Sequence, residues 1–333
     1  MTDVQKILEV AQAAGRKAAV VCRAVHAQTP ESMDKGDKSP VTIADYGSQA
    51  VILRELAAAF PDHGVISEEG SEHLRESAGD NGAATIVQLV NDATGESADF
   101  DQVCAWIDHE GVEGAEFTWA IDPIDGTKGF LRRQQYAIAI GLMRNGVPFA
   151  GVMVCPNLPV DLSNPDGAKG VMYVAAHGQG CQRVALDAGD CGSTNSSGSE
   201  DPSTWRVLGS VESAHGDPKL VVTMMEEAGV HGGFVRYDSQ VKYGIIAEGA
   251  AEIYLRPRSK PDYRENIWDH VAGVICCQEA GGVVTDVDGK PLDFTLGKKL
   301  LENRGVLATG NPDMHAKVVA GIAAAEAALK AQA

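Results

Sequence analysis

The fold and the candidate site are organised around one stretch at residues 119–130, WAIDPIDGTKGF. A short apolar run ends just before Asp122, so we expect this aspartate to lie where a strand meets solvent. Pro123 fixes φ and removes one backbone donor, and Gly126 permits a tight turn after Asp125. The stretch therefore predicts a bend that gathers oxygen atoms from Asp122, Ile124, Asp125 and Thr127.

An all-oxygen cluster of this kind suits a hard cation such as Mg²⁺, which takes carboxylates, carbonyls, waters and substrate phosphate as ligands. The alternative is an Asp-Gly turn between two strands, which is a common local structure. The short motif by itself leaves both interpretations open, so the rest of the chain has to decide between them.

The motif DPIDGT at residues 122–127 resembles the signature of the Mg²⁺-dependent, lithium-sensitive phosphomonoesterases, the superfamily of inositol monophosphatases. Further matching blocks follow the expected order: SPVTIADY at 39–46, SEE at 67–69 and WDHVAG at 268–273. Two longer matches, KGFLR at 128–132 and YRENIWD at 263–269, are most similar to the 3'(2'),5'-bisphosphate nucleotidase branch. The resemblance covers nearly the whole chain and is weakest at residues 71–118 and 185–203.

The resemblance implies a site that binds two to three Mg²⁺ ions. One ion would take Glu68, Asp122 and the carbonyl of Ile124, and a second would take Asp122, Asp125 and Asp269. A third, weaker ion would share Glu68 and be held mostly by water. Lithium sensitivity then follows from displacement of one weakly held Mg²⁺.

Two residues are implied to be catalytic, Asp45 and Thr127. The matching aspartate of the family accepts a hydrogen bond from the motif threonine, which positions and deprotonates the attacking water. From the residues alone, Asp45 is better explained as an acidic residue near a helix N-terminus, where the helix dipole favours it, and the resemblance reverses this preference.

The substrate-binding set implied by the resemblance is Gly126, Thr127, His215, Ser239, Lys242, Arg256 and Asp269. Ser239 and Lys242 are three residues apart, which places them on one face of a helix. Together with Arg256 they would hold a second phosphate, while His215 would lie near the adenine or ribose. Arg258 follows closely and is expected to compete with or assist Arg256. Without the resemblance, these residues are typical of a surface histidine, a helix cap and solvated cations.

Apolar periodicity predicts the elements of an α/β protein. In the first lobe we expect helices over 3–26 and about 45–60 and strands at 65–66, 136–143, 149–154, 170–176 and 180–185. Asn-Gly at 145–146 predicts a hairpin between two of these strands. We also expect a mobile excursion over the active site at 71–118, with one helix-like run at 85–90, and a linker at 187–201. In the second we expect strands at 207–211 and 251–255 and helices at 220–228, from 239, over 269–281 and from 312, the last with Asn311 as its cap. The resemblance implies a layered αβαβα sandwich. An α+β lobe (1–200) would carry most metal ligands, and an α/β lobe (203–333) would carry the nucleotide-binding residues and the last metal ligand.

The composition limits which binding partners and which cellular location we expect for the chain. The chain has 333 residues, and its net charge of −18 argues against binding a nucleic acid polymer. No apolar run is long enough to span a membrane, and the N-terminus begins directly with a helical pattern and shows no signal peptide. We therefore expect a monomeric, cytoplasmic protein, with organelle targeting as the alternative if a presequence is missing from the sequence.

The seven cysteines are an odd number without metal-binding spacing, which favours reduced thiols. A weaker hypothesis concerns Cys181 and Cys191, which flank a Gly- and Asp-rich loop that could bring them within disulfide distance. The alternative is two unpaired thiols.

These features predict a Mg²⁺-dependent phosphoric monoester hydrolase of the bisphosphate nucleotidase kind. Its reaction would remove the 3'-phosphate of 3'-phosphoadenosine 5'-phosphate, releasing AMP and phosphate, with 3'-phosphoadenosine 5'-phosphosulfate as a further substrate. An alternative is an inositol polyphosphate 1-phosphatase or inositol monophosphatase. A different class, a non-catalytic nucleotide sensor, is disfavoured because such a protein need not keep the full set Asp45, Glu68, Asp122, Asp125, Thr127 and Asp269.

Overall fold

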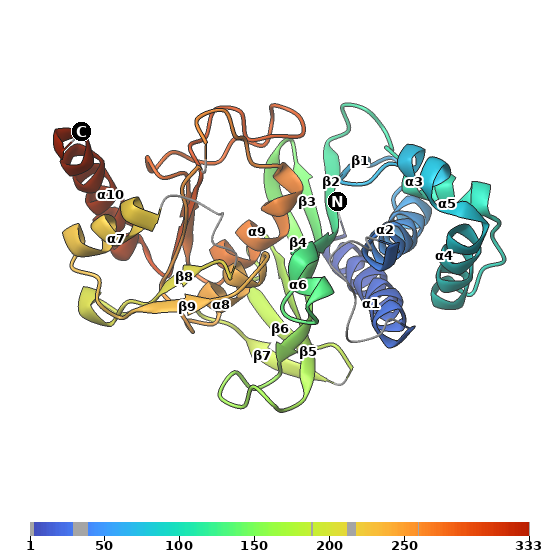
Figure 1. Cartoon of the computed structure of the whole chain (residues 1–333), viewed down its shortest axis with the longest axis horizontal. Helices are drawn as coiled ribbons and strands as arrows, with labels where there is room; N and C mark the ends of the chain where they lie inside the picture. Colours follow the sequence, from blue (N-terminus) through green and yellow to red (C-terminus); the bar gives the residue numbers. More distant parts are fainter. Residues whose placement is uncertain (1–2, 29–38, 188, 212–217, 259, 333) are drawn as a thin grey trace.

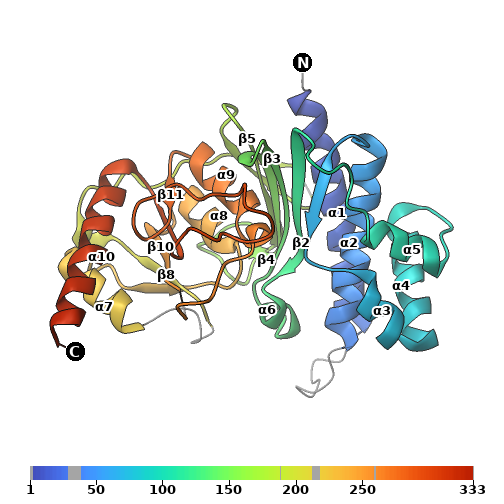
Figure 2. The same ribbon diagram turned by 90° about the horizontal axis from the view of Figure 1, so that it is seen from above.

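The computed structural model describes residues 3–28, 39–187, 189–211, 218–258 and 260–332. Five layers follow one another in Figures 1 and 2: helices, a sheet, two inner helices, a second sheet and two outer helices. This order confirms the predicted αβαβα sandwich.

The first lobe contains helices α1 (Val4–Gln28), α2 (Ser39–Ala59), α3 (Ser71–Ser77), α4 (Gly79–Thr94), α5 (Phe100–Ile107) and α6 (Thr127–Leu131). Its strands are β1 (Gly64–Ser67), β2 (Phe117–Asp125), β3 (Ala137–Arg144), β4 (Val147–Pro159), β5 (Lys169–Ala176), β6 (Cys181–Ala185) and β7 (Asp190–Ser193). These strands form one sheet in chain order, and only β1 and β2 are parallel. The predicted hairpin is confirmed at Asn145 and Gly146, whose φ angles of 51° and 76° are those that a tight hairpin turn needs.

The prediction that residues 71–118 form a mobile excursion over the active site is wrong. The segment forms α3, α4 and α5, whose apolar residues are buried against α1 and α2 on the outer side of the first sheet (Figure 1). Leu89, Val90 and Val103 are among these buried side chains. Because the segment hides an apolar stripe, burial of that stripe stabilises it as part of the outer helical layer.

The second lobe contains β8 (Val207–Gly209), α7 (Pro218–Glu227), β9 (Phe234–Arg236), α8 (Val241–Ala247), β10 (Ile253–Arg256), the 3₁₀ turn η2 (Ile267–Asp269), α9 (Val271–Glu279), β11 (Val283–Thr285), β12 (Val306–Thr309) and α10 (Pro312–Gln332). Its sheet has the order β11-β12-β10-β8-β9. Helices α8 and α9 fill the space between the two sheets, and α7 and α10 cover the outer face of the second (Figure 2). Asn311 caps α10 as predicted, because its side-chain oxygen accepts from the Met314 N–H at 2.8 Å.

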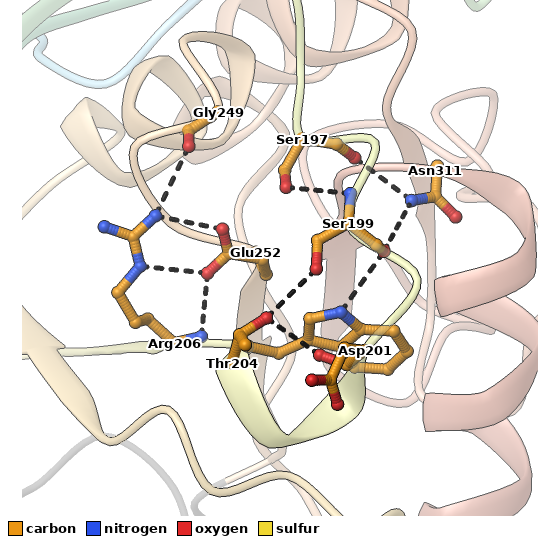
Figure 3. A network of polar contacts seen from close by, with 9 residues as sticks. Ser197, Ser199, Asp201, Thr204, Arg206, Gly249, Glu252 and Asn311 are labelled. Carbon is orange, nitrogen blue, oxygen red and sulfur yellow. Dashed lines mark hydrogen bonds and ion pairs between the residues drawn. The ribbon is translucent and has the colours of Figure 1, made fainter.

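The segment predicted as a linker, residues 187–201, is tied into both lobes. Its first part includes β7, which pairs with β6. Beyond it, the Ser196 hydroxyl is 3.0 Å from the carbonyl of Ala280 and 2.6 Å from that of Gly310. Figure 3 shows how the Asn311 amide donates to the carbonyl of Ser197 at 3.0 Å. The connection between the lobes is therefore fixed by hydrogen bonds along its length.

An ion pair continues this polar network (Figure 3). Glu252 accepts from the backbone N–H of Arg206 at 2.8 Å and from its guanidinium at 2.9 and 3.0 Å. The pair fixes the entry of the chain into β8, next to the start of β10 and at the opposite end of these two parallel strands from Gly209 and Arg256.

Cys181 is buried in β6, and a hydrogen bond with the Cys276 side chain of α9 lowers the pKa of its thiol. The side chain of Cys191 lies outside the described residues, so the disulfide hypothesis stays a prediction. Among the described segments, no helix combines the length and apolar character needed to cross a membrane.

A pair of glycines sets how closely α9 approaches the first sheet. Gly141 of β3 and Gly151 of β4 are directly opposite each other in the ladder. A Cβ atom on Gly141 would lie 2.6 Å from a methyl carbon of Val271, and one on Gly151 would lie 2.9 Å from the carbonyl oxygen of Ala272. Contacts below 3 Å leave no room for a side chain, so the bare backbone of these strands is what allows α9 to rest on the sheet.

We expect Gly151→Ala to lower the free energy of unfolding by about 1–3 kcal/mol, the usual cost of overpacking a tight contact. Urea denaturation monitored by circular dichroism measures this loss. Gly198→Ala is the matched control, because a Cβ atom there meets nothing within 4 Å. Equal stability of the two variants would contradict the close approach of α9.

Candidate active site

A cavity of about 630 Å³ opens between the two sheets, and both lobes contribute to its walls. Ten predicted site residues line it: Glu68, Asp122, Ile124, Asp125, Gly126, Thr127, Ser239, Lys242, Arg256 and Asp269. The structure thus brings together side chains that are up to two hundred positions apart in the chain.

The central motif forms the end of β2 and the turn into α6. Asp122 is only 2% exposed, so the prediction that it meets solvent at a strand end is wrong. The strand continues to Asp125 with an irregular register between the two aspartates, because the backbone N–H of Ile124 turns to donate to Asp122 at 3.0 Å. Gly126 has a φ of 90°, which confirms the predicted tight turn before Thr127.

Glu68 reaches the cavity from the end of β1, the parallel neighbour of β2. Its backbone N–H donates to the carbonyl of Ile121 at 3.2 Å, which fixes it beside the central motif. The next residue, Glu69, is bound on both sides by the buried amide of Gln49: its carbonyl accepts at 2.7 Å and its N–H donates at 3.0 Å. Gln49 of α2 is a positioning residue that sequence reasoning missed, since its partner is 20 positions away.

Asp269 comes from the second lobe, in the 3₁₀ turn directly before α9. The close packing of α9 on β3 and β4 therefore places this carboxylate against those of the first lobe. Its pKa is raised to about 6 by burial and then by the charge of Asp125. This carboxylate completes the predicted set of four.

The four carboxyl groups all resist ionisation. Burial is the largest cause in each case, and it raises the pKa of Glu68 to about 7 and that of Asp122 well above its ordinary value. The pKa of Asp125 is also raised by burial, although Lys242 and the N–H of Gln240 oppose the shift. Mutual repulsion adds to the shifts of Glu68 and Asp122, which share a hydrogen bond. Several buried carboxylates without enough positive charge nearby are the environment that a divalent cation stabilises, so the donor set fits Mg²⁺.

The hydrogen bond expected between Asp45 and Thr127 is not formed in the described part of the chain. The Thr127 hydroxyl instead donates to the carbonyl of Ile124 at 3.5 Å. Asp45 lies in the second turn of α2, 7% exposed, and burial followed by the charges of Glu69 and Glu68 raises its pKa. It thus lies close to the acidic cluster, but apart from the cavity wall.

Ser239 and Lys242 do not share a helix face as predicted, because α8 begins only at Val241. Ser239 has a φ of 64°, an unusual conformation for a residue with a side chain, and it packs against Gly126. This conformation directs the N–H of Gln240 to Asp125 at 2.5 Å. The Lys242 ammonium folds back to the carbonyl of Ser239 at 2.7 Å, and burial lowers its pKa to about 8.

Arg256 lines the cavity at the end of β10, whereas Arg258 does not. The Arg258 guanidinium donates to the carbonyl of Asn303, away from the site, which removes it as a competitor. His215 lies outside the described residues, so its predicted place near the adenine or ribose stays a prediction.

The cavity also contains residues that sequence reasoning missed. An apolar wall includes Val222 and Phe234, which are 46% and 49% exposed although both are large and hydrophobic. Nearby, buried Asp238 accepts from Arg132 at 2.8 Å and from the Ser210 hydroxyl at 2.9 Å, which links the two lobes. No local pattern distinguishes these residues from ordinary strand and loop positions.

Comparisons with known proteins agree with this geometry. The model of the "Inositol monophosphatase family" matches residues 3–327. The chain is 35% identical over 291 residues to a 3'(2'),5'-bisphosphate nucleotidase of Schizosaccharomyces pombe, covering 83% of this chain and 82% of the relative. It is 37% identical over 321 residues to one of Oryza sativa, covering 91% and 89%.

Among solved structures, an inositol monophosphatase from Anabaena superposes with a TM-score of 0.63 at 22% identity, covering 97% of both chains. This likeness extends to the fold, and the family match extends over almost the whole sequence. The chain belongs to the inositol monophosphatase family.

Proposed function

We propose that this protein is a Mg²⁺-dependent 3'(2'),5'-bisphosphate nucleotidase that hydrolyses the 3'-phosphate of 3'-phosphoadenosine 5'-phosphate. The observation that carries the proposal is one cavity with a cluster of four carboxylates and, facing it, the buried cations Lys242 and Arg256. Relatives more than a third identical to this chain bear the name of that activity. The 5'-phosphosulfate analogue would be a further substrate.

The inositol monophosphatase family is generally Mg²⁺-dependent. Glu68, Asp122 and the Ile124 carbonyl would hold one ion, and Asp122, Asp125 and Asp269 a second, with a third sharing Glu68. When bound, Mg²⁺ supplies neutralisation of phosphoryl charge and activation of water. Lithium sensitivity, typical of the family, would follow from loss of the weakest ion.

The chain's own groups would orient the reactants. The Thr127 hydroxyl lies at the start of α6, within reach of the Ile124 carbonyl, and would accept a hydrogen bond from the attacking water. Asp45 lies nearby and would receive the proton in its ionised form, and its raised pKa would make that carboxylate a stronger base. The N–H of Gln240 holds Asp125 in place, so that this carboxylate does not move as charge develops.

Two features favour a nucleotide over an inositol phosphate. Lys242 and Arg256 offer positive charge for a second phosphate. Lys242 is buried and Arg256 is only 18% exposed, which strengthens the attraction. The wall with Val222 and Phe234 offers an apolar surface that a purine base can cover, whereas inositol has hydroxyl groups on every side. The inositol phosphatase is therefore the second candidate. A cytoplasmic location and a monomeric state stay predictions.

We expect Asp122→Asn to abolish phosphate release, because the residue would contribute to two metal sites. Malachite-green detection of phosphate, with 3'-phosphoadenosine 5'-phosphate and inositol phosphates compared side by side, tests both the metal assignment and the substrate. Calorimetric titration with Mg²⁺ gives an independent reading, and circular dichroism checks the fold. Near-normal turnover by the folded variant would overturn the metal assignment.

Removal of Mg²⁺ should make the protein less stable as the pH rises. A carboxyl with a higher pKa in the folded than in the unfolded state stabilises fully below the unfolded value, and this effect is lost as pH rises through the folded value. For Glu68 the two values are 4.5 and about 7. We therefore expect the melting temperature in EDTA to fall between about pH 5 and pH 8, and Mg²⁺ to raise it more at the upper end.

Glu68→Gln should flatten this pH dependence, while Glu252→Gln, which removes a carboxylate outside the cavity at the start of β10, should leave it unchanged. A melting temperature in EDTA that rises steadily over the same range would contradict the clustered carboxylates.

We expect Lys242→Met to raise KM for 3'-phosphoadenosine 5'-phosphate about ten- to hundredfold, which corresponds to about 1.5–3 kcal/mol for a charge-assisted contact. The methionine keeps an unbranched side chain in the same space, so packing is largely preserved. KM for 3'-AMP, which has no second phosphate, should change little. Equal losses on both substrates would show that Lys242 serves the fold instead, and an unchanged KM for the bisphosphate would favour the inositol phosphatase.

A further inference from the structure

A buried ion pair lies behind the substrate-facing surface of Arg256. Its Nη2 atom is 2.9 Å from Oε2 of Glu265, and the two side chains are 18% and 3% exposed. The same nitrogen is 3.9 Å from Oδ2 of Asp269 and 3.3 Å from the hydroxyl of Tyr263. Arg256 thus has two carboxylates within reach, and Glu265 is the nearer one.

On the side away from Arg256, the carboxylate of Glu265 lies next to buried groups that do not line the cavity. Nε2 of His270 lies 3.5 Å from the same carboxylate oxygen, and Nδ1 of His270 is 2.8 Å from the hydroxyl of Tyr243. Both His270 and Tyr243 are completely buried. The backbone of Glu265 is also fixed, because its carbonyl accepts from the N–H of Leu300 at 2.9 Å.

This chain of contacts gives Glu265 a well-defined position between α8, α9 and β10. Arginine has a long, flexible side chain, and its orientation costs conformational entropy unless a partner has already fixed it. A carboxylate anchored on its far side supplies this fixation before any ligand binds.

We propose that Glu265 is a positioning residue for substrate binding, which holds the Arg256 guanidinium toward the second phosphate and away from Asp269. The inference rests on the proposed role of Arg256 in binding that phosphate. Without the Glu265 charge, the nearest remaining carboxylate is that of Asp269. The guanidinium would then pair with Asp269, which would weaken phosphate binding and compete with a cation for the same carboxylate.

The test compares Glu265→Gln, Glu265→Asp and Arg256→Lys. Glutamine keeps the shape of the side chain but removes its charge, and we expect KM for 3'-phosphoadenosine 5'-phosphate to rise about tenfold. With both substrates measured at saturating Mg²⁺, KM for 3'-AMP should stay close to that of the parent protein. Glu265→Asp keeps the charge and should restore part of the loss. Arg256→Lys should raise KM for the bisphosphate, because a lysine cannot reproduce the planar contact.

Two calorimetric measurements do not depend on turnover. Glu265→Gln should weaken the binding of 5'-AMP relative to adenosine, and it should weaken the binding of Mg²⁺ alone. The matched control is Glu252→Gln, which removes the charge of another buried glutamate, paired with Arg206 at 2.9 Å in the same lobe but away from the cavity. It should lower the melting temperature and leave all these affinities unchanged.

The outcomes distinguish a failure of the proposed role of Arg256 from a failure of the inference about Glu265. An unchanged KM for the bisphosphate in Arg256→Lys would overturn the role of Arg256, and the inference with it. A raised KM in that variant together with unchanged KM and 5'-AMP binding in Glu265→Gln would overturn the inference alone. Equal losses on the bisphosphate and on 3'-AMP in folded Glu265→Gln would do the same, and Glu265→Asp provides this comparison if the glutamine variant does not fold.

Discussion

The contact between α9 and the first sheet is the constraint on which the rest of the site depends. Helix α9 rests on the bare backbone of Gly141 and Gly151, and the turn that precedes it carries Asp269. A side chain at either glycine would push the helix outward, together with that carboxylate. The position of the last acidic group is thus decided by the absence of two side chains in strands that carry no catalytic residue.

The close approach has an electrostatic cost. Glu68, Asp122, Asp125 and Asp269 are all shifted toward their protonated forms by burial. The second lobe offsets part of this cost, because the N–H of Gln240 and the charges of Lys242 and Arg256 favour the ionised form of Asp125. The unusual backbone of Ser239 belongs to this compensation, because it directs that N–H to Asp125. Complete compensation requires cations from solution, so ion binding and stability are coupled.

Much of the site could be predicted from the sequence, because its chemistry is concentrated in short segments. The oxygen-rich turn at Asp122–Thr127 and the hairpin at Asn145 follow from local conformational preferences. The predicted exposure of Asp122 was wrong, because β1 and η2, which come from distant parts of the chain, pack beside the strand that carries it. Of the helices in residues 71–118, only a helix-like run at 85–90 was predicted, because polar residues dilute the apolar stripe of this segment, whose partners are α1 and α2. The conformation of Ser239 and the role of Glu265 depend on tertiary contacts that no local pattern contains.

The hydrogen-bonded segment that connects the lobes, predicted as a linker at residues 187–201, has a consequence for how the protein discriminates among ligands. Ser197 and Asn311 join this segment to the start of α10 (Figure 3). Ser196 joins it to the end of α9, and β7 pairs with β6 of the first sheet, so the two lobes are not connected by a free tether. These hydrogen bonds therefore restrict changes in the spacing between the carboxylate cluster and the two cations. A cleft whose width is restricted in this way selects molecules by the distance between their two anionic groups, which must match the spacing between the carboxylate cluster and the cations. It tolerates variation in the scaffold that joins those groups.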